Sequence, residues 1–181
     1  MKSSLVLISL LLISLASAQS DKNVENHQFK INFLFPGIIY EVGIQKNSTL
    51  KFKLGAAFVL GLHSESDVDF GFFPFVETQY RRYYNFNRRL KKGKNIESNT
   101  ANYVGLTTVY TIGNAVLGDY NIANSNNFFV GPIYGLQRTY KRGFNFGIEF
   151  GAGYFNNNRG QGLNIGADFT IGWVLGKNRN R

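Results

Sequence analysis

Hydrophobic and polar residues alternate one by one through a long regular stretch near the end of the chain, residues 163–175. A side-chain period of two is that of a β-strand. The apolar side of this strand holds Leu163, Ile165, Ala167, Phe169, Ile171, Trp173 and Leu175, and the other side is polar and rich in glycine. The stretch therefore predicts a strand with two chemically different faces.

The same alternation recurs along the chain and predicts further strands. They span 29–35, 38–45, 49–60, 70–83, 101–112, 128–140 and 144–155. Pro36-Gly37 separates the first two, and it is either a turn, which gives eight strands, or a kink, which gives seven. Pro132 lies inside a predicted strand and cannot donate a ladder hydrogen bond, so we expect a β-bulge there.

The distribution of glycines indicates which face is inside. The large apolar residues exclude nearly every charge from their own face, and the glycines lie on the opposite, charged face. An exposed strand surface gains nothing from glycine, which weakens it. A narrow barrel interior needs glycine to make room for long charged side chains. The pattern therefore favours an all-β transmembrane, antiparallel up-and-down barrel with apolar residues outward, and the even strand numbers of such barrels favour eight.

The first residues have the pattern of a cleavable signal peptide. Lys2 precedes an apolar run, Leu5 to Leu15, which Ala16-Ser17-Ala18 follows as a cleavage site. The expected organisation is a signal peptide over 1–18, a flexible N-terminus over 19–28, a β-barrel domain over 29–175 and a basic tail over 176–181.

The net charge limits the kinds of partner that the protein is expected to bind. The net charge is +9, or +8 without Lys2, and the chain has no cysteine. For an exported protein this balance favours anionic surfaces such as lipid and lipopolysaccharide, and its compartment argues against nucleic acid. An even strand number places both termini in the periplasm. The periplasmic connections are then 46–48, 84–100 and 141–143, and the outer loops are 36–37, 61–69, 113–127 and 156–162.

Several short motifs carry a family resemblance. Asn32 to Glu41 reads N-F-L-F-P-G-I-I-Y-E, and R-Y-Y-N at 82–85 is followed by K-K-G-K at 91–94. In these motifs, and in its eight expected strands, the chain resembles small outer-membrane β-barrel proteins of Gram-negative bacteria, the OmpA/OmpX-like class. The resemblance implies a monomer in the cell outer membrane. It also implies an assembly signal, read by the barrel-assembly machinery, that here comprises Asn164, Gly166, Phe169 and Ile171.

The charges on the inner face give two hypotheses for the lumen. Four acidic and three basic residues are expected there: Glu41, Glu77, Glu149 and Asp168 with Lys51, Lys53 and Arg81. They form either a closed plug of ion pairs or the lining of an ion path. The interior of eight strands is just wide enough for side chains to fill, and buried charges must be paired, so the plug is favoured.

A second group of charges lies in the long connection 84–100. Arg88, Arg89, Lys91 and Lys92 are the candidates for contact with an anionic partner, although a charge run is more often simply solvated.

Catalytic and metal-binding patterns are weak. His63 beside Ser64 is the one candidate catalytic pair, and residues 63–69 have oxygen ligands for calcium without a recognisable spacing. We therefore expect no enzyme activity, no metal and no cofactor. The predicted function is that of an outer-membrane barrel of structural or surface-interaction type. The alternatives are a small passive channel for ions or small apolar molecules and a soluble exported β-protein that binds a ligand.

Overall fold

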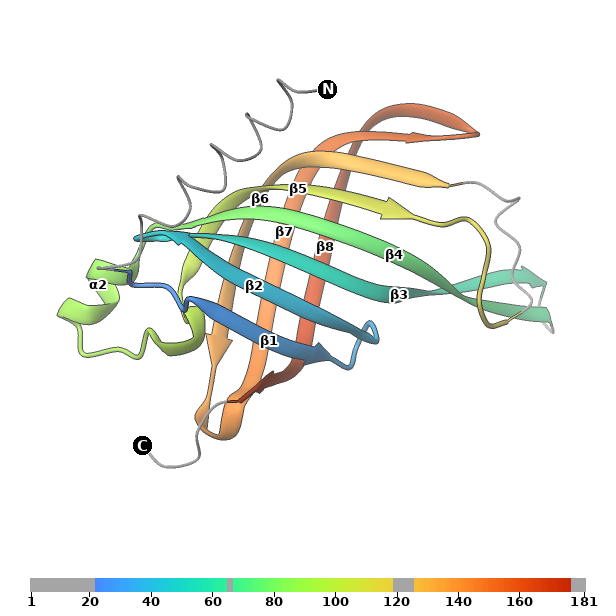
Figure 1. Ribbon diagram of the computed structural model, residues 1–181. Helices are drawn as coiled ribbons and strands as arrows, with labels where there is room; N and C mark the ends of the chain where they lie inside the picture. The colour runs from blue at the N-terminus through green and yellow to red at the C-terminus, as the bar shows by residue number, and fades with distance from the viewer. Residues whose placement is uncertain (1–21, 65–66, 119–125, 177–181) are drawn as a thin grey trace, which may run out of the picture.

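The computed structural model describes residues 22–64, 67–118 and 126–176 (Figure 1). The expected signal peptide and all of the basic tail after Gly176 lie outside these residues. The strands are β1 (His27–Asn32), β2 (Gly37–Gln45), β3 (Ser48–Ser64), β4 (Asp67–Tyr83), β5 (Asn102–Thr111), β6 (Asn127–Thr139), β7 (Phe144–Asn157) and β8 (Gly160–Leu175). Short helical segments are α2 (Phe86–Lys91), η1 (Glu97–Asn99) and η2 (Lys141–Gly143). In the described part of the chain, no helix is long and apolar enough to cross a membrane.

The eight strands form a closed ring in which each strand is antiparallel to the next. The ring closes between β1 and β8 through a short ladder that runs from Phe29 opposite Leu175 to Asn32 opposite Gly172. The chain turns at 33–36 between two strands, so Pro36 ends the turn and Gly37 begins β2. The prediction of an all-β fold with eight antiparallel strands is confirmed.

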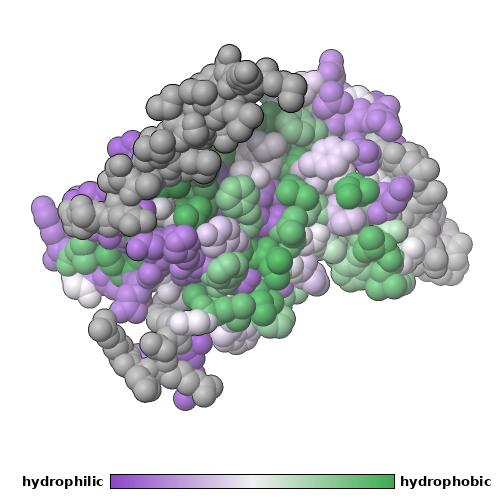
Figure 2. All heavy atoms as spheres, viewed as in Figure 1, coloured by the Kyte–Doolittle hydropathy of each residue, from purple (hydrophilic) through white to green (hydrophobic). Residues whose placement is uncertain are grey.

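The two faces of the ring differ as the alternation predicted. In β3, Phe52 points outward with 42% of its surface exposed, and its neighbour Lys53 points inward with 1% exposed. The same alternation holds along β2 and β4, where Glu41 and Arg81 are buried. Figure 2 shows apolar side chains grouped over the middle of the visible face, with hydrophilic residues at the end that carries α2.

Two expected outer loops are mostly strand. The hairpin of β3 and β4 extends through most of 61–69, because the pairing continues from the long ladder below it to Ser64 opposite Asp67. The loop expected at 156–162 is a tight turn at 158–159. There the Asn157 side-chain oxygen accepts the amides of Arg159 (2.9 Å) and Gly160 (3.0 Å), which fixes the turn.

The alternation misplaces two residues at the end of β1. The strand ends at Asn32, so Leu34 and Phe35 belong to the turn that follows, where a period of two no longer applies. An alternation continued to the end of the predicted strand 29–35 puts Leu34 inside and Phe35 outside. In the structure Leu34 is exposed, and Phe35 lines a cavity in the ring.

The expected bulge at Pro132 is wrong. The register between β6 and β7 is the same before and after this residue, from Val130 opposite Tyr154 to Ile133 opposite Gly151. Pairing is simply interrupted between these two points, while Pro132 still lies opposite Leu106 of β5. The missing amide is therefore accommodated by a gap in one ladder.

One end of the ring is closed by segments that the sequence placed outside it. Residues 22–28, expected to be flexible, are held by side chains: the Glu25 amide donates to Asn99 Oδ1 (2.8 Å), and Glu25 Oε1 accepts the Ser98 amide (2.7 Å). The connection after β4 turns inward, so that Phe86 is buried against Tyr83 with ring centroids 5.1 Å apart. The apolar core lies here and comprises Val24, Tyr83, Phe86, Ala101, Tyr103 and Ile133.

Candidate functional site: the lumen of the ring

The seven charged residues predicted for the inner face come from five strands and meet in the lumen. Six of them are buried, and the Asp168 side chain is the most accessible, at 26%. Lys51 Nζ lies 2.6 Å from Glu77 Oε1, and Arg81 Nη2 lies 3.1 Å from Glu149 Oε2. The alternation therefore identified a group of side chains that contact one another across the ring.

Lys30 is the eighth member of this network, and the count of lumen charges missed it. Its Nζ lies 2.8 Å from Glu41 Oε2 and donates to Gln137 Oε1 at 2.7 Å. The inward position of Lys30 in the first predicted strand was the signal that could have found it. With Lys30 the network contains four basic and four acidic side chains, so it is neutral.

Glu41 is fully buried, and its carboxylate accepts hydrogen bonds from three side chains. Lys30 reaches one carboxylate oxygen, while Thr49 Oγ1 (2.7 Å) and the Tyr83 hydroxyl (2.6 Å) donate to the other. A buried carboxylate is stable only with such compensation. Tyr83 therefore joins the charged network to the apolar core that closes the ring.

Arg81 forms the opposite side of the network. Its guanidinium donates to Gln79 Oε1 (2.6 Å) and to Glu149, and its carbon lies 4.2 Å from the centre of the Tyr103 ring. Tyr103 in turn donates to Glu149 Oε2 at 2.8 Å. This planar, many-donor arrangement suits arginine rather than lysine.

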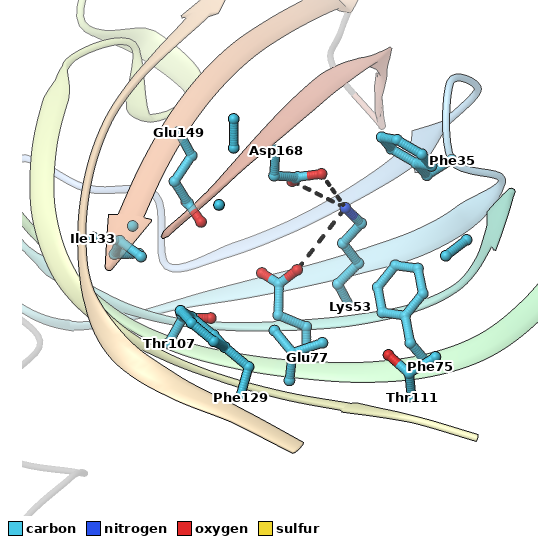
Figure 3. A pocket seen from close by; sticks show the side chains of 15 residues that line it. Phe35, Lys53, Phe75, Glu77, Thr107, Thr111, Phe129, Ile133, Glu149 and Asp168 are labelled. Carbon is cyan, nitrogen blue, oxygen red and sulfur yellow. Dashed lines mark hydrogen bonds and ion pairs between the residues drawn. The ribbon is translucent and has the colours of Figure 1, made fainter. Parts of the chain in front are cut away.

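Lys53 occupies the boundary between the network and an open space above it. Its Nζ lies 3.1 Å and 3.3 Å from the two oxygens of Asp168 and 3.9 Å from Glu77 Oε2 (Figure 3). The same ammonium lies over the rings of Phe75 (5.2 Å) and Phe35 (5.9 Å). Lys53 thus contacts both the charged network and the aromatic side chains that line the open space.

The space above Lys53 is a cavity of about 250 Å³. Its walls include Phe75, Phe129 and Ile133 from strands β4 and β6. The other end of the ring is closed by the apolar core around Tyr83 and Phe86. The described part of the lumen is therefore filled by ion-paired side chains toward the α2 end and has a cavity next to Lys53.

The basic residues of the connection 84–100 lie apart from the lumen. Arg88, Lys91 and Lys92 are exposed on or just after α2. Arg89 is partly enclosed, because its guanidinium donates twice to the Asn95 carbonyl oxygen, at 2.8 Å and 3.0 Å. Three of the four basic side chains are therefore exposed to solvent, and the fourth, Arg89, stabilises the loop that follows α2.

The residues of the expected assembly signal lie on β8. Asn164 and Gly166 are exposed, and Phe169 and Ile171 point outward from the ring. None of the four belongs to the charged network.

The residues considered for metal binding or catalysis give little to describe. The side chains of 61–68, which include His63 and Ser64, lie outside the described residues. Among the side chains that the structure does describe, no group of three or more His, Cys, Asp or Glu residues is placed to hold a metal ion.

Comparisons with protein-family models, with curated proteins and with solved structures give no match for this chain. The inference of function therefore depends on the geometry described above. Chemically, that geometry pairs each of its eight charges and places tyrosine and amide groups around them. It is suited to holding a ring closed.

Proposed function

We propose that this protein is an integral β-barrel of the bacterial outer membrane with a structural or surface-interaction role, similar to the OmpA/OmpX-like class. The single observation that carries the proposal is the reversal of the usual order of burial. Phe29, Leu54 and Phe150 are each more than half exposed, whereas Lys30, Glu41 and Arg81 are buried. In lipid, apolar side chains on the outside cost nothing, and a polar lumen is the norm.

The extent of the apolar face supports the same proposal. Soluble monomers rarely expose apolar patches larger than a few hundred Å². Here exposed large apolar side chains occur on all eight strands, in an unbroken sequence of neighbouring strands around the ring. A bilayer would cover this whole surface at once, whereas a single protein partner would cover one side.

The paired lumen argues for a barrel that does not conduct. An ion would have to displace charges that already have partners, and the end near α2 is closed by the buried rings of Tyr83 and Phe86. Under this proposal the partners are outer-membrane lipid and lipopolysaccharide, with the barrel-assembly machinery during insertion. The exposed cations Arg88, Lys91 and Lys92 are then the proposed contacts to an anionic partner at the periplasmic end.

The proposal is tested by cell fractionation and by gel mobility. We expect the mature chain in the outer-membrane fraction, soluble only with detergent, and we expect unboiled protein to migrate differently from boiled protein. Recovery of folded protein from the periplasm without detergent would contradict the membrane placement. In planar bilayers the purified protein should give no discrete conductance steps, and steady single-channel steps would instead favour a pore.

A further inference from the structure

The cavity above Lys53 has features of a ligand site that the proposed structural role does not use. We propose that it binds a small, neutral, mostly apolar molecule that carries one hydrogen-bonding group. Support for this site comes from the cavity itself, from one polar atom in its wall that has no described partner, and from a gap in the strand pairing beside it.

The walls of the cavity select an apolar molecule. They carry the side chains of Phe35, Phe75, Val109, Phe129 and Ile133 (Figure 3). A volume of about 250 Å³ lies just below the range of ~300–1,000 Å³ that is common for drug-sized ligands. The ligand is therefore small, of the size of one or two fused rings.

The charge of the cavity selects a neutral molecule. Lys53 is paired with Asp168, Glu77 is paired with Lys51, and the whole network is neutral. A charged ligand would bring an uncompensated charge between these apolar walls, or would have to displace Asp168 from Lys53. A neutral ligand requires neither.

The hydroxyl group of Thr107 in the cavity wall favours a ligand with a polar group. The Thr107 side chain is only 4% exposed and lines the cavity, and its Oγ1 has no hydrogen-bond partner among the residues that the structure describes. Buried hydroxyl groups are nearly always hydrogen-bonded. A hydroxyl or carbonyl group on a bound molecule would satisfy it.

The strand pairing of the closed ring has a gap beside the cavity. β2 pairs with β3 only as far as Gly55, and β1 pairs with β8 only from Gly172 onward. The turn at 33–36 still bonds to the Ala56 amide and to the Ile171 carbonyl oxygen. Further along, no described strand pairs with the facing edges of β3 and β8. Ala57 and Gly166, which lie on those edges, both line the cavity. A small molecule can therefore reach the cavity from the side, next to the partly exposed Asp168.

The test uses 2-naphthol, which is neutral at pH 7 and carries one hydroxyl, as a probe of the refolded full-length mature protein in detergent. Naphthalene lacks the hydroxyl, and 2-naphthoate carries a negative charge. We expect saturable binding of 2-naphthol, with naphthalene and 2-naphthoate each at least threefold weaker in titration calorimetry. Thr107→Val keeps the shape of the side chain but removes the hydroxyl. It should weaken the binding of 2-naphthol about three- to tenfold and leave the binding of naphthalene unchanged.

Two alanines in one strand supply a matched pair of variants. Ala57→Phe fills the cavity and should abolish binding, whereas Ala56→Phe places the same ring on the opposite face and should leave binding unchanged. If Ala57→Phe does not refold, Gly166→Phe replaces it, because a Cβ at Gly166 meets no atom within 4 Å. Equal binding by both alanine variants, tighter binding of 2-naphthoate, or no saturable binding at all would overturn the proposal. None of these results depends on membrane insertion, which the fractionation experiment tests separately.

Discussion

At the scale of single residues, the buried carboxylate of Glu41 accepts hydrogen bonds from three side chains of the lumen. Replacement of Glu41 by Gln leaves the ammonium of Lys30 buried without its counter-charge. Breaking a buried pair in this way costs about 3–5 kcal/mol. We therefore expect Glu41→Gln to lower the free energy of unfolding by that amount, measured by urea titration in detergent.

The double variant separates pairing from general damage. Lys30→Met with Glu41→Gln removes both charges, so it should cost less than Glu41→Gln alone. Lys92→Gln, at an exposed position, serves as the control and should change stability by no more than ~0.5 kcal/mol. The single variant Lys30→Met completes the set. If the stability loss of the double variant equals the sum of the losses of the two single variants, the two charges do not act as a pair.

Individual side chains were predictable from the sequence wherever a strand was regular. The alternation gave the inward positions of Lys53 and Glu77 correctly, and it also placed Lys30 inward. It failed for Phe35, because the strand had already ended at Asn32 and a turn has no fixed period. The alternation could not predict which side chains pair with one another. The hydroxyl of Tyr83, for example, reaches Glu41 only because the ring closes.

At the scale of elements, closure of the ring depends on the short ladder between β1 and β8. A Cβ built at Gly172 would overlap the carbonyl oxygen of Ile31 in the facing strand. Gly172→Val should therefore prevent closure and abolish the mobility difference between unboiled and boiled protein on a gel. Gly160→Val adds the same side chain at an open position of β8 and should keep that difference. Closure that survives Gly172→Val would show that the ladder is dispensable.

The connection between β4 and β5 provides a second prediction at this scale. Phe86 is buried against Tyr83, so its replacement by Ala should cost about 3–5 kcal/mol of unfolding free energy. Leu90, in the same helix, is half exposed, and Leu90→Ala should cost less than ~1 kcal/mol. Equal effects of the two substitutions in urea titration would mean that α2 does not seal the ring.

The fold of this connection was not predictable from its composition. Its many basic residues indicated a solvated loop, and Arg88, Lys91 and Lys92 are indeed exposed. Yet one aromatic residue, Phe86, and the turn around Ser98 place part of the segment inside the ring. Ser98 has a left-handed backbone, and its carbonyl oxygen accepts from Gln137, a long-range contact that local pattern does not encode.

At the scale of the whole molecule, an apolar exterior has different consequences in water and in lipid. Leu54 lies in the middle of β3, between Ile38 and Val76 on the neighbouring strands, and all three side chains are exposed. In a soluble protein an exposed Leu→Arg substitution changes stability by no more than ~0.5 kcal/mol. At the middle of a bilayer an arginine on the lipid face costs about 2–4 kcal/mol. The two environments therefore predict different results for one variant.

Leu90 provides a matched control for the substitution of Leu54. Its exposed fraction, 50%, nearly equals the 51% of Leu54, but it lies on α2, outside the barrel wall. We expect Leu54→Arg to destabilise the protein by about 2–4 kcal/mol in urea titrations in lipid bilayers, and Leu90→Arg to have little effect. If both variants are as stable as the original protein, the outer face of β3 does not contact acyl chains. The apolar belt would then require a protein partner to cover it.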